Sequence, residues 1–200
     1  MPRRLILIGS LSIILSLVIS SAVESVVLLP VGSFAIVPGD SSVTFSVPDN
    51  RGGFTGRTTK ITGRIVVEPR QDGEEYIASV DAMIDTPSIT TGDGTRDASM
   101  RSTFLKTGEF PHMTFKGTMS AHPGLAVRPF AATVHGQLTI RDVTRDAEFP
   151  TMVTALAREF LADAETTVRM ADYGIPYPRA FIFVARDPVT VTLHIRAQPR

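Results

Sequence analysis

The chain has 200 residues, which is enough for one domain with its own hydrophobic core. Hydrophobic residues make up 43% and charged residues 20%, a balance typical of a folded globular protein and not of a disordered one. The 20 basic and 20 acidic residues cancel, so no excess of positive charge favours nucleic-acid binding. Cysteine is absent, which excludes disulfides, thiol catalysis and thiolate metal sites.

The N-terminal residues have the pattern of an export signal. Arg3 and Arg4 precede an almost wholly apolar stretch over residues 5–19, and residues 20–22 offer small side chains where a signal peptidase would cut. We therefore expect residues 1–22 to be a signal peptide. An uncleaved anchor helix reaching to about residue 31 is the alternative, because residues 5–23 are already long enough to span a bilayer. In both cases we expect the domain, residues 34–198, to lie outside the cytoplasm, periplasmic or secreted.

From residue 43 onward the dominant hydrophobic period is two. Apolar and polar residues alternate over residues 43–47, 61–67, 79–85, 113–119, 133–141 and 189–197. Successive side chains of a strand point to opposite faces, so each run has one apolar and one polar face. Turn residues separate the runs, as at residues 48–53. The pattern predicts an all-β domain of about eight antiparallel strands, folded as a sandwich or a barrel.

Two segments depart from this alternation. Residues 96–108 predict a short helix, with Asp97 as its N-cap and with Met100 and Phe104 on its inner side. Residues 152–163 have the composition of a helix, but the β-rich residues that follow favour a strand from about Glu159.

No motif points to catalysis or to a metal. The histidines stand at positions 112, 122, 135 and 194, without HxH or HExxH spacing, and His135 and His194 fall on the polar faces of their predicted strands. Residues 92–97 lack the spaced carboxylates of a calcium loop, and no GxSxG nucleophile motif occurs. We therefore expect a protein that is not an enzyme and that holds no metal and no cofactor.

Short segments spread over the domain carry a family resemblance. They are residues 40–47 (DSSVTFSV), 53–57 (GFTGR), 88–92 (SITTG), 113–116 (MTFK), 136–140 (GQLTI) and 172–175 (DYGI). In this order and spacing they are similar to the YceI-like domain family, which comprises lipocalin-like, polyisoprenoid-binding proteins. The chain departs from the family pattern at several positions. Thr90 stands where the family has an acidic residue, Ser99-Met100 where it has a His-Leu pair, and Asp142 where it has a glycine. The family also has aromatic residues near Thr58 and Ile61.

The resemblance implies an up-and-down β-barrel with one short helix and an elongated apolar cavity for an isoprenoid tail. The ligand is then a polyisoprenoid, a quinone or another long-chain lipid, taken up or delivered at a membrane surface. The apolar positions of the domain, including the inner side of the predicted helix, supply the predicted cavity lining: Phe45, Val47, Phe54, Ile65, Met100, Phe104, Phe115, Leu138 and Ile140. Gly63, Gly117 and Gly136 on the same faces predict room for the tail.

Arg96, Asp97 and Arg101 are expected at the cavity mouth. They either fix a loop through ion pairs or hold a polar head group by bidentate arginine contacts. The main alternative to a carrier is a filled barrel, anchored at the membrane, that acts as a structural or protein-interaction module. An enzyme acting on a lipid-like substrate would need polar groups inside the barrel. A homodimer is a further expectation.

Overall fold

The structure is a computed structural model that describes residues 30–71, 75–121, 129–156, 158–180 and 183–200. The signal peptide or anchor expected at residues 1–22 lies outside the described residues. Within these ranges, no helix is both long and apolar enough to cross a membrane.

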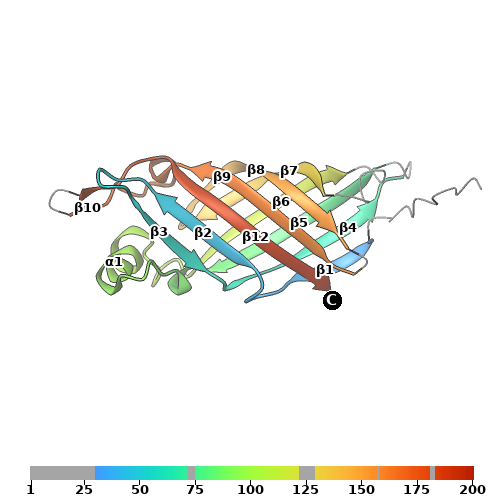
Figure 1. The fold of residues 1–200 in the computed structure, drawn as a ribbon, viewed down its shortest axis with the longest axis horizontal. Coiled ribbons are helices and arrows are strands. Elements are labelled where there is room, and N and C mark those ends of the chain that lie inside the picture. The colour runs from blue at the N-terminus through green and yellow to red at the C-terminus, as the bar shows by residue number, and fades with distance from the viewer. Residues whose placement is uncertain (1–29, 72–74, 122–128, 157, 181–182) are drawn as a thin grey trace, which may run out of the picture.

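Antiparallel strands form a closed, elongated barrel with eight strand positions around its wall (Figure 1). Each strand pairs with its neighbour, and β12 pairs back with β1 to close the sheet. The bounds are β1 (Gly32–Ile36), β4 (Ile61–Pro69), β5 (Tyr76–Asp85), β6 (His112–Ala121), β7 (Phe130–Ile140), β8 (Val143–Ala155), β9 (Phe160–Val168) and β12 (Val189–Pro199). The predicted all-β, antiparallel barrel is confirmed.

Two wall positions are each shared by a pair of shorter strands. β2 (Ser42–Val47) pairs with β12 beyond the point where β1 leaves it, so β1 and β2 together form one interrupted strand. β3 (Phe54–Thr58) pairs with β2, and β4 follows it directly, so β3 and β4 together form a second interrupted strand. The interruption between β1 and β2 contains Pro38 and Gly39, and the positive φ of +89° at Gly39 suits a glycine.

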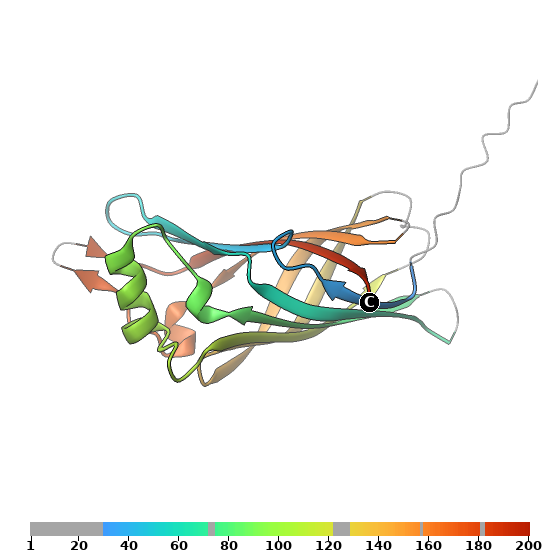
Figure 2. The same cartoon turned by 90° about the horizontal axis from the view of Figure 1, so that it is seen from below.

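The short elements gather at one end of the barrel (Figures 1 and 2). They are η1 (Thr86–Ser88), α1 (Gly94–Ser99), a π-helical turn η2 (Met100–Phe104), η4 (Met170–Tyr173) and the small hairpin of β10 (Arg179–Ala180) and β11 (Phe183–Val184). The predicted short helix is confirmed as an element, but Asp97 is not its N-cap. Asp93 caps α1 by accepting hydrogen bonds from the backbone N of Thr95 (3.0 Å) and of Arg96 (2.9 Å).

In the segment of helical composition over residues 152–163, the described residues, all but 157, contain no helix. β8 continues to Ala155, and β9 begins at Phe160, next to the predicted Glu159. Thr151 and Val153 are buried while Met152 is exposed, so this end of β8 still alternates. Cross-strand pairing with β7 and β9 outweighs the helix propensity of the segment.

The barrel end opposite α1 is filled by a compact cluster that we call the floor cluster. It comprises Phe34, Val67, Ala78, Ala121, Phe130, Val153, Phe160 and Ala197. Each of the eight barrel strands named above contributes one of these residues. The rings of Phe34 on β1 and Phe160 on β9 pack edge to face with centroids 4.8 Å apart, so these two strands are joined by an aromatic contact inside the barrel.

Candidate functional site

A cavity of about 870 Å³ occupies the barrel between the floor cluster and α1. This volume lies in the upper part of the range of small-molecule sites, roughly 300–1,000 Å³. The inward-facing Val80, Leu138 and Leu193 line it and are only half-buried, because part of each side chain faces the hollow and part packs on buried neighbours in the wall. The barrel is therefore hollow above the floor cluster, which is inconsistent with a filled barrel.

All nine side chains predicted to line the cavity lie on its wall. Phe45 lies on β2, Phe54 on β3 and Phe115 on β6. Phe104 is the last residue of η2. Strand alternation turns the strand residues inward, and the inner side of η2 supplies Met100 and Phe104.

Other wall residues did not follow from the sequence pattern. Met170, Ile175 and Ala185 lie in or beside η4 and β11, outside the alternating runs, so no periodicity marked them as inward-facing. Val191 and Leu193 on β12 belong to an alternating run that was recognised, and this alternation was the signal that could have assigned them to the wall.

Gly63, Gly117 and Gly136 do not line the cavity, which corrects the expectation that they make room for a tail. A methyl group on Gly117 would lie 2.6 Å from Cζ of Phe115 and 2.7 Å from the carbonyl oxygen of His135. Gly117 and Gly136 are cross-strand partners, and a methyl group on Gly136 would meet the backbone of the neighbouring strand. These glycines permit close packing of β6 and β7 around an aromatic ring.

Charged residues on the wall gather at the end near α1, which we call the mouth. They are Asp49 and Arg51 from the loop between β2 and β3, and Asp93 and Arg96 from the start of α1. The guanidinium of Arg96 lies 4.5 Å from the ring centre of Phe54 and 3.6 Å from Oδ2 of Asp93. Since Arg51 and Asp93 are exposed to solvent, this is where the cavity meets water.

Asp49 organises the loop at the mouth. Its Oδ1 accepts hydrogen bonds from the backbone N of Arg51 (2.6 Å) and of Gly53 (2.8 Å). These two bonds hold the pKa of the Asp49 carboxyl below its ordinary value, and the nearby charge of Arg96 lowers the pKa further. The carboxylate is therefore charged at neutral pH.

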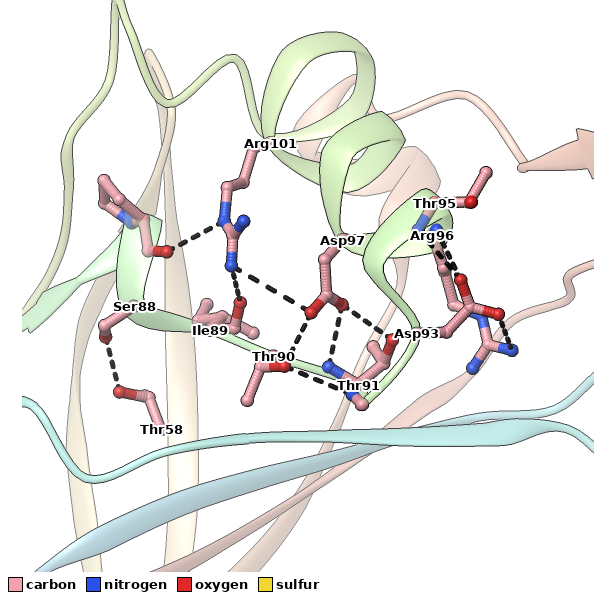
Figure 3. A network of polar contacts seen from close by, with 12 residues as sticks. Thr58, Ser88, Ile89, Thr90, Thr91, Asp93, Thr95, Arg96, Asp97 and Arg101 are labelled. Carbon is pink, nitrogen blue, oxygen red and sulfur yellow. Dashed lines mark hydrogen bonds and ion pairs between the residues drawn. The ribbon is translucent and has the colours of Figure 1, made fainter.

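Asp97 and Arg101 do not reach the cavity wall and instead hold the segment that runs from η1 to α1 (Figure 3). Asp97 is buried, and its carboxylate accepts hydrogen bonds from Oγ1 of Thr90 (2.6 Å), Oγ1 of Thr91 (2.7 Å) and the backbone N of Thr91 (2.8 Å). Arg101 donates to the carbonyl oxygens of Pro87 (2.9 Å) and Ile89 (3.1 Å). Asp97 and Arg101 were expected either to fix a loop or to hold a polar head group, and these contacts are of the kind that fixes a loop.

Burial and hydrogen bonding act in opposite directions on the Asp97 carboxyl. Burial raises its pKa, but the hydrogen bonds from Thr90 and Thr91 and the charge of Arg101 outweigh burial, so the pKa is lowered. Asp97 therefore remains ionised and keeps its three acceptor bonds at neutral pH.

The departures from the family pattern lie largely on the cavity wall. Thr58, Ile61, Ser99 and Met100 all line it. The hydroxyl of Thr58 is 2.6 Å from that of Ser88, so this polar group is satisfied within the wall. Near Thr58 and Ile61, where the resemblance implied aromatic residues, the wall carries a small and an aliphatic side chain.

In the part of the chain that the structure describes, no group of three or more His, Cys, Asp or Glu side chains is placed to hold a metal ion. Two histidines form single pairs on exposed strand faces. His135 Nδ1 lies 3.3 Å from Glu148, and His194 Nδ1 lies 2.6 Å from Asp163. His122 lies outside the described residues.

Comparison with known proteins identifies the family. The sequence model of the YceI-like domain matches residues 34–197. The chain belongs to the YceI-like domain family. None of the curated proteins compared matches the chain.

Solved structures share the fold of this YceI-like domain. Burkholderia cenocepacia BcnA superposes with a TM-score of 0.66 at 17% identity, over 82% of this chain and 99% of that chain. A polyisoprenoid binding domain from Saccharophagus degradans, described as implicated in plant cell wall breakdown, superposes with a TM-score of 0.64 at 16% identity, over 84% of this chain and 98% of its own. At these identities the likeness shows the fold alone.

Proposed function

We propose that the protein binds a long apolar lipid, a polyisoprenoid or a quinone, with the tail in the barrel cavity. The observation that carries the proposal is the cavity of about 870 Å³, whose charged wall residues are confined to the mouth. The description of the Saccharophagus degradans neighbour as a polyisoprenoid binding domain supports the same ligand class. The binding takes place outside the cytoplasm, at or near a membrane surface, and involves no chemical step.

Burial of the tail supplies enough free energy without a polar anchor. Each methylene moved from water to an apolar site contributes about 0.8 kcal/mol. Roughly ten sheltered methylenes contribute on the order of 8 kcal/mol, and the association cost is about 4–15 kcal/mol. About twenty sheltered methylenes contribute on the order of 16 kcal/mol, so a tail of that length binds on hydrophobic burial alone.

The polar groups on the wall favour binding over catalysis. The hydroxyl of Thr151, deep in the barrel, donates to the carbonyl oxygen of Phe149 at 2.7 Å, and the hydroxyl of Thr58 is paired with Ser88. Both groups satisfy internal partners, as buried polar groups must. The hydrogen bonds of Thr151 and Thr58 therefore help to keep the wall compatible with a hydrocarbon chain.

The proposal is tested on the full-length protein purified from its expression host. We expect extraction with organic solvent, followed by mass spectrometry, to release a long-chain isoprenoid, and the refolded lipid-free protein to take up an added polyprenol. Absence of a co-purified lipid, together with no uptake, would contradict the proposal. A native mass spectrum of the same sample also reports whether residues 1–22 have been removed and whether the protein is a dimer.

A matched pair of variants on β5 separates the cavity from the outer surface. Val80 lines the cavity, whereas its neighbour Ser79 is exposed on the outside of the barrel. We expect Val80→Glu to abolish lipid uptake, since an ionised carboxylate in an apolar cavity opposes the hydrocarbon chain. Ser79→Glu should bind lipid as the wild type does, and thermal unfolding of both variants checks that each is folded.

A further inference from the structure

The cavity ends at a defined layer of the barrel. On β9, Ala162 lines the cavity and Phe160, the next inward-facing residue, belongs to the floor cluster. On β4, Ile65 lines the cavity and Val67 belongs to the floor cluster. The same two-residue step occurs on β1, β5, β8 and β12. The cavity is thus a blind tube whose closed end is one layer of side chains, contributed by all the barrel strands.

The floor cluster is packed too tightly for a hydrocarbon chain to pass. Phe34, Phe130 and Phe160 are each less than a tenth exposed, and the rings of Phe34 and Phe160 are in contact edge to face. On the two remaining strands, Met119 and Ala132 pack against the same cluster between the wall and the floor. Close packing of this kind leaves no space for a further methylene without displacing a ring.

The tail enters from the opposite end. The charged wall residues Asp49, Arg51, Asp93 and Arg96 lie at the mouth, where Arg51 and Asp93 are exposed, and the wall between them and the floor cluster is almost entirely apolar. A lipid with a polar end therefore keeps that end at the mouth and directs its tail toward Phe160. The distance between the mouth and the floor then limits how much of the tail is sheltered.

We propose that the floor cluster sets the isoprenoid chain length at which affinity stops rising, which we call the length preference, with Ala162 and Phe160 as the residues that determine this length. The inference rests on the proposed lipid-binding function. Each sheltered methylene strengthens binding about fourfold, whereas a methylene beyond the filled cavity stays in water and adds nothing. Affinity therefore rises with each isoprene unit until the tail reaches the floor, and is constant for longer tails.

Two substitutions move the floor in opposite directions. Ala162 sits between Val153 of the floor cluster and Ile195 of the wall on its neighbouring strands. Ala162→Leu adds volume just above Phe160 and raises the floor, so affinity should level off at a shorter chain. Phe160→Ala removes a ring from the floor, so affinity should go on rising to a longer chain.

The test measures binding of a series of all-trans isoprenoid alcohols, each one isoprene unit longer than the last, by native mass spectrometry and by calorimetry. Ala131→Leu is the matched control, because Ala131 lies next to the floor residue Phe130 but is exposed on the outer face. Its length preference should equal that of the wild type. Thermal unfolding is recorded for each variant, and Phe160→Leu, which removes less volume, replaces Phe160→Ala should the latter not fold.

The outcomes separate this inference from the function on which it rests. Opposite shifts in the preferred chain length for Ala162→Leu and for the Phe160 variant support the floor as the determinant. Binding of the alcohols with a length preference that neither variant moves overturns the inference and leaves the proposed function standing. Failure of the wild-type protein to bind any alcohol overturns the proposed function, and this inference with it.

Discussion

Asp93 and Asp97 stand four residues apart, and their carboxylates serve different segments. Asp93 caps the first turn of α1, while Asp97, inside the same helix, binds the preceding loop at Thr90 and Thr91. Either residue fits an N-cap by its chemistry, and Asp97 was the predicted one. The choice depends on which backbone N–H groups lack a partner, and this is known only once the start of the helix is known.

Replacing Asp97 should weaken the fold and alter its response to acid. The pKa of Asp97 is below its ordinary value of 3.8, so the unfolded chain binds this proton more tightly than the folded protein. The stability due to Asp97 is therefore complete above about pH 4 and is lost as pH falls through the lower folded pKa. We expect the Asp97→Asn variant to have a free energy of unfolding roughly 1–3 kcal/mol below that of the wild type at neutral pH. On acidification, the free energy of unfolding should fall less in the variant than in the wild type.

Urea unfolding at neutral pH and at about pH 3, below the ordinary carboxyl pKa, measures both effects. Asp146→Asn is the control, because Asp146 is exposed on β8, and its free energy of unfolding at neutral pH should change by less than about 0.5 kcal/mol. An Asp97→Asn protein as stable as the wild type at neutral pH would show that the three hydrogen bonds contribute nothing.

At the scale of elements, α1 depends on its surroundings. A helix of six residues is too short to be stable by itself, and the contacts of Asp97 and Arg101 attach it to the loop that precedes it. That loop in turn pairs with β3, since the backbone N of Arg57 donates to the carbonyl oxygen of Thr90 at 2.8 Å. The mouth of the cavity is therefore built by linked short elements.

Removing the helix cap should loosen this end of the barrel locally. We expect Asp93→Ala to cost about 1 kcal/mol, because two backbone N–H groups lose their acceptor. Hydrogen exchange at the amides of Thr95 and Arg96 should become faster, while exchange in the floor cluster stays unchanged. Asp93→Ser, which keeps a capping oxygen, should restore most of the protection, and a failure to do so would assign the effect to the lost ion pair with Arg96.

Strands with long alternating runs were predicted from sequence, and short or polar ones were not. The six alternating runs correspond to β2, β4, β5, β6, β7 and β12. β1 and β3 have five residues each, and their sequences, GSFAI and FTGRT, do not alternate strictly between apolar and polar residues. In β8 the large inward side chains are confined to Phe149 and Val153, so its alternation is weak. Pairing with neighbouring strands, a non-local effect, holds these segments in the sheet.

At the scale of the whole molecule, stability and binding are divided between the two ends of the barrel. The floor cluster consists of buried residues, whereas the wall combines buried residues such as Ile36 and Phe149 with half-buried ones such as Phe54 and Val80. The half-buried wall residues therefore gain less from packing than the floor residues do, and they leave apolar surface that a ligand can cover.

This division predicts different costs for the same substitution at the two ends. Phe34 is 3% exposed and packs on Phe160, whereas Phe54 faces the cavity near the mouth. We expect Phe34→Ala to cost about 3–5 kcal/mol of unfolding free energy, and Phe54→Ala to cost clearly less. Equilibrium urea unfolding of refolded, lipid-free protein measures both values. Equal costs would contradict the division between a packed end and a hollow one.

By itself, the sequence determined the class of fold and the apolar face of most strands. Alternation with period two is a local property of the chain, and it shows which side chains share a face, as in the run from Val189 to Ala197 on β12. For the same reason, six of the predicted lining residues were found as inward-facing ones: Phe45, Val47, Ile65, Phe115, Leu138 and Ile140. Only the tertiary structure decided that Ile195 borders a hollow while Ala197, two residues on, lies in a solid floor. Both positions belong to the same alternating face, and they differ only in how close the opposite side of the barrel comes, which depends on side chains distant in the sequence.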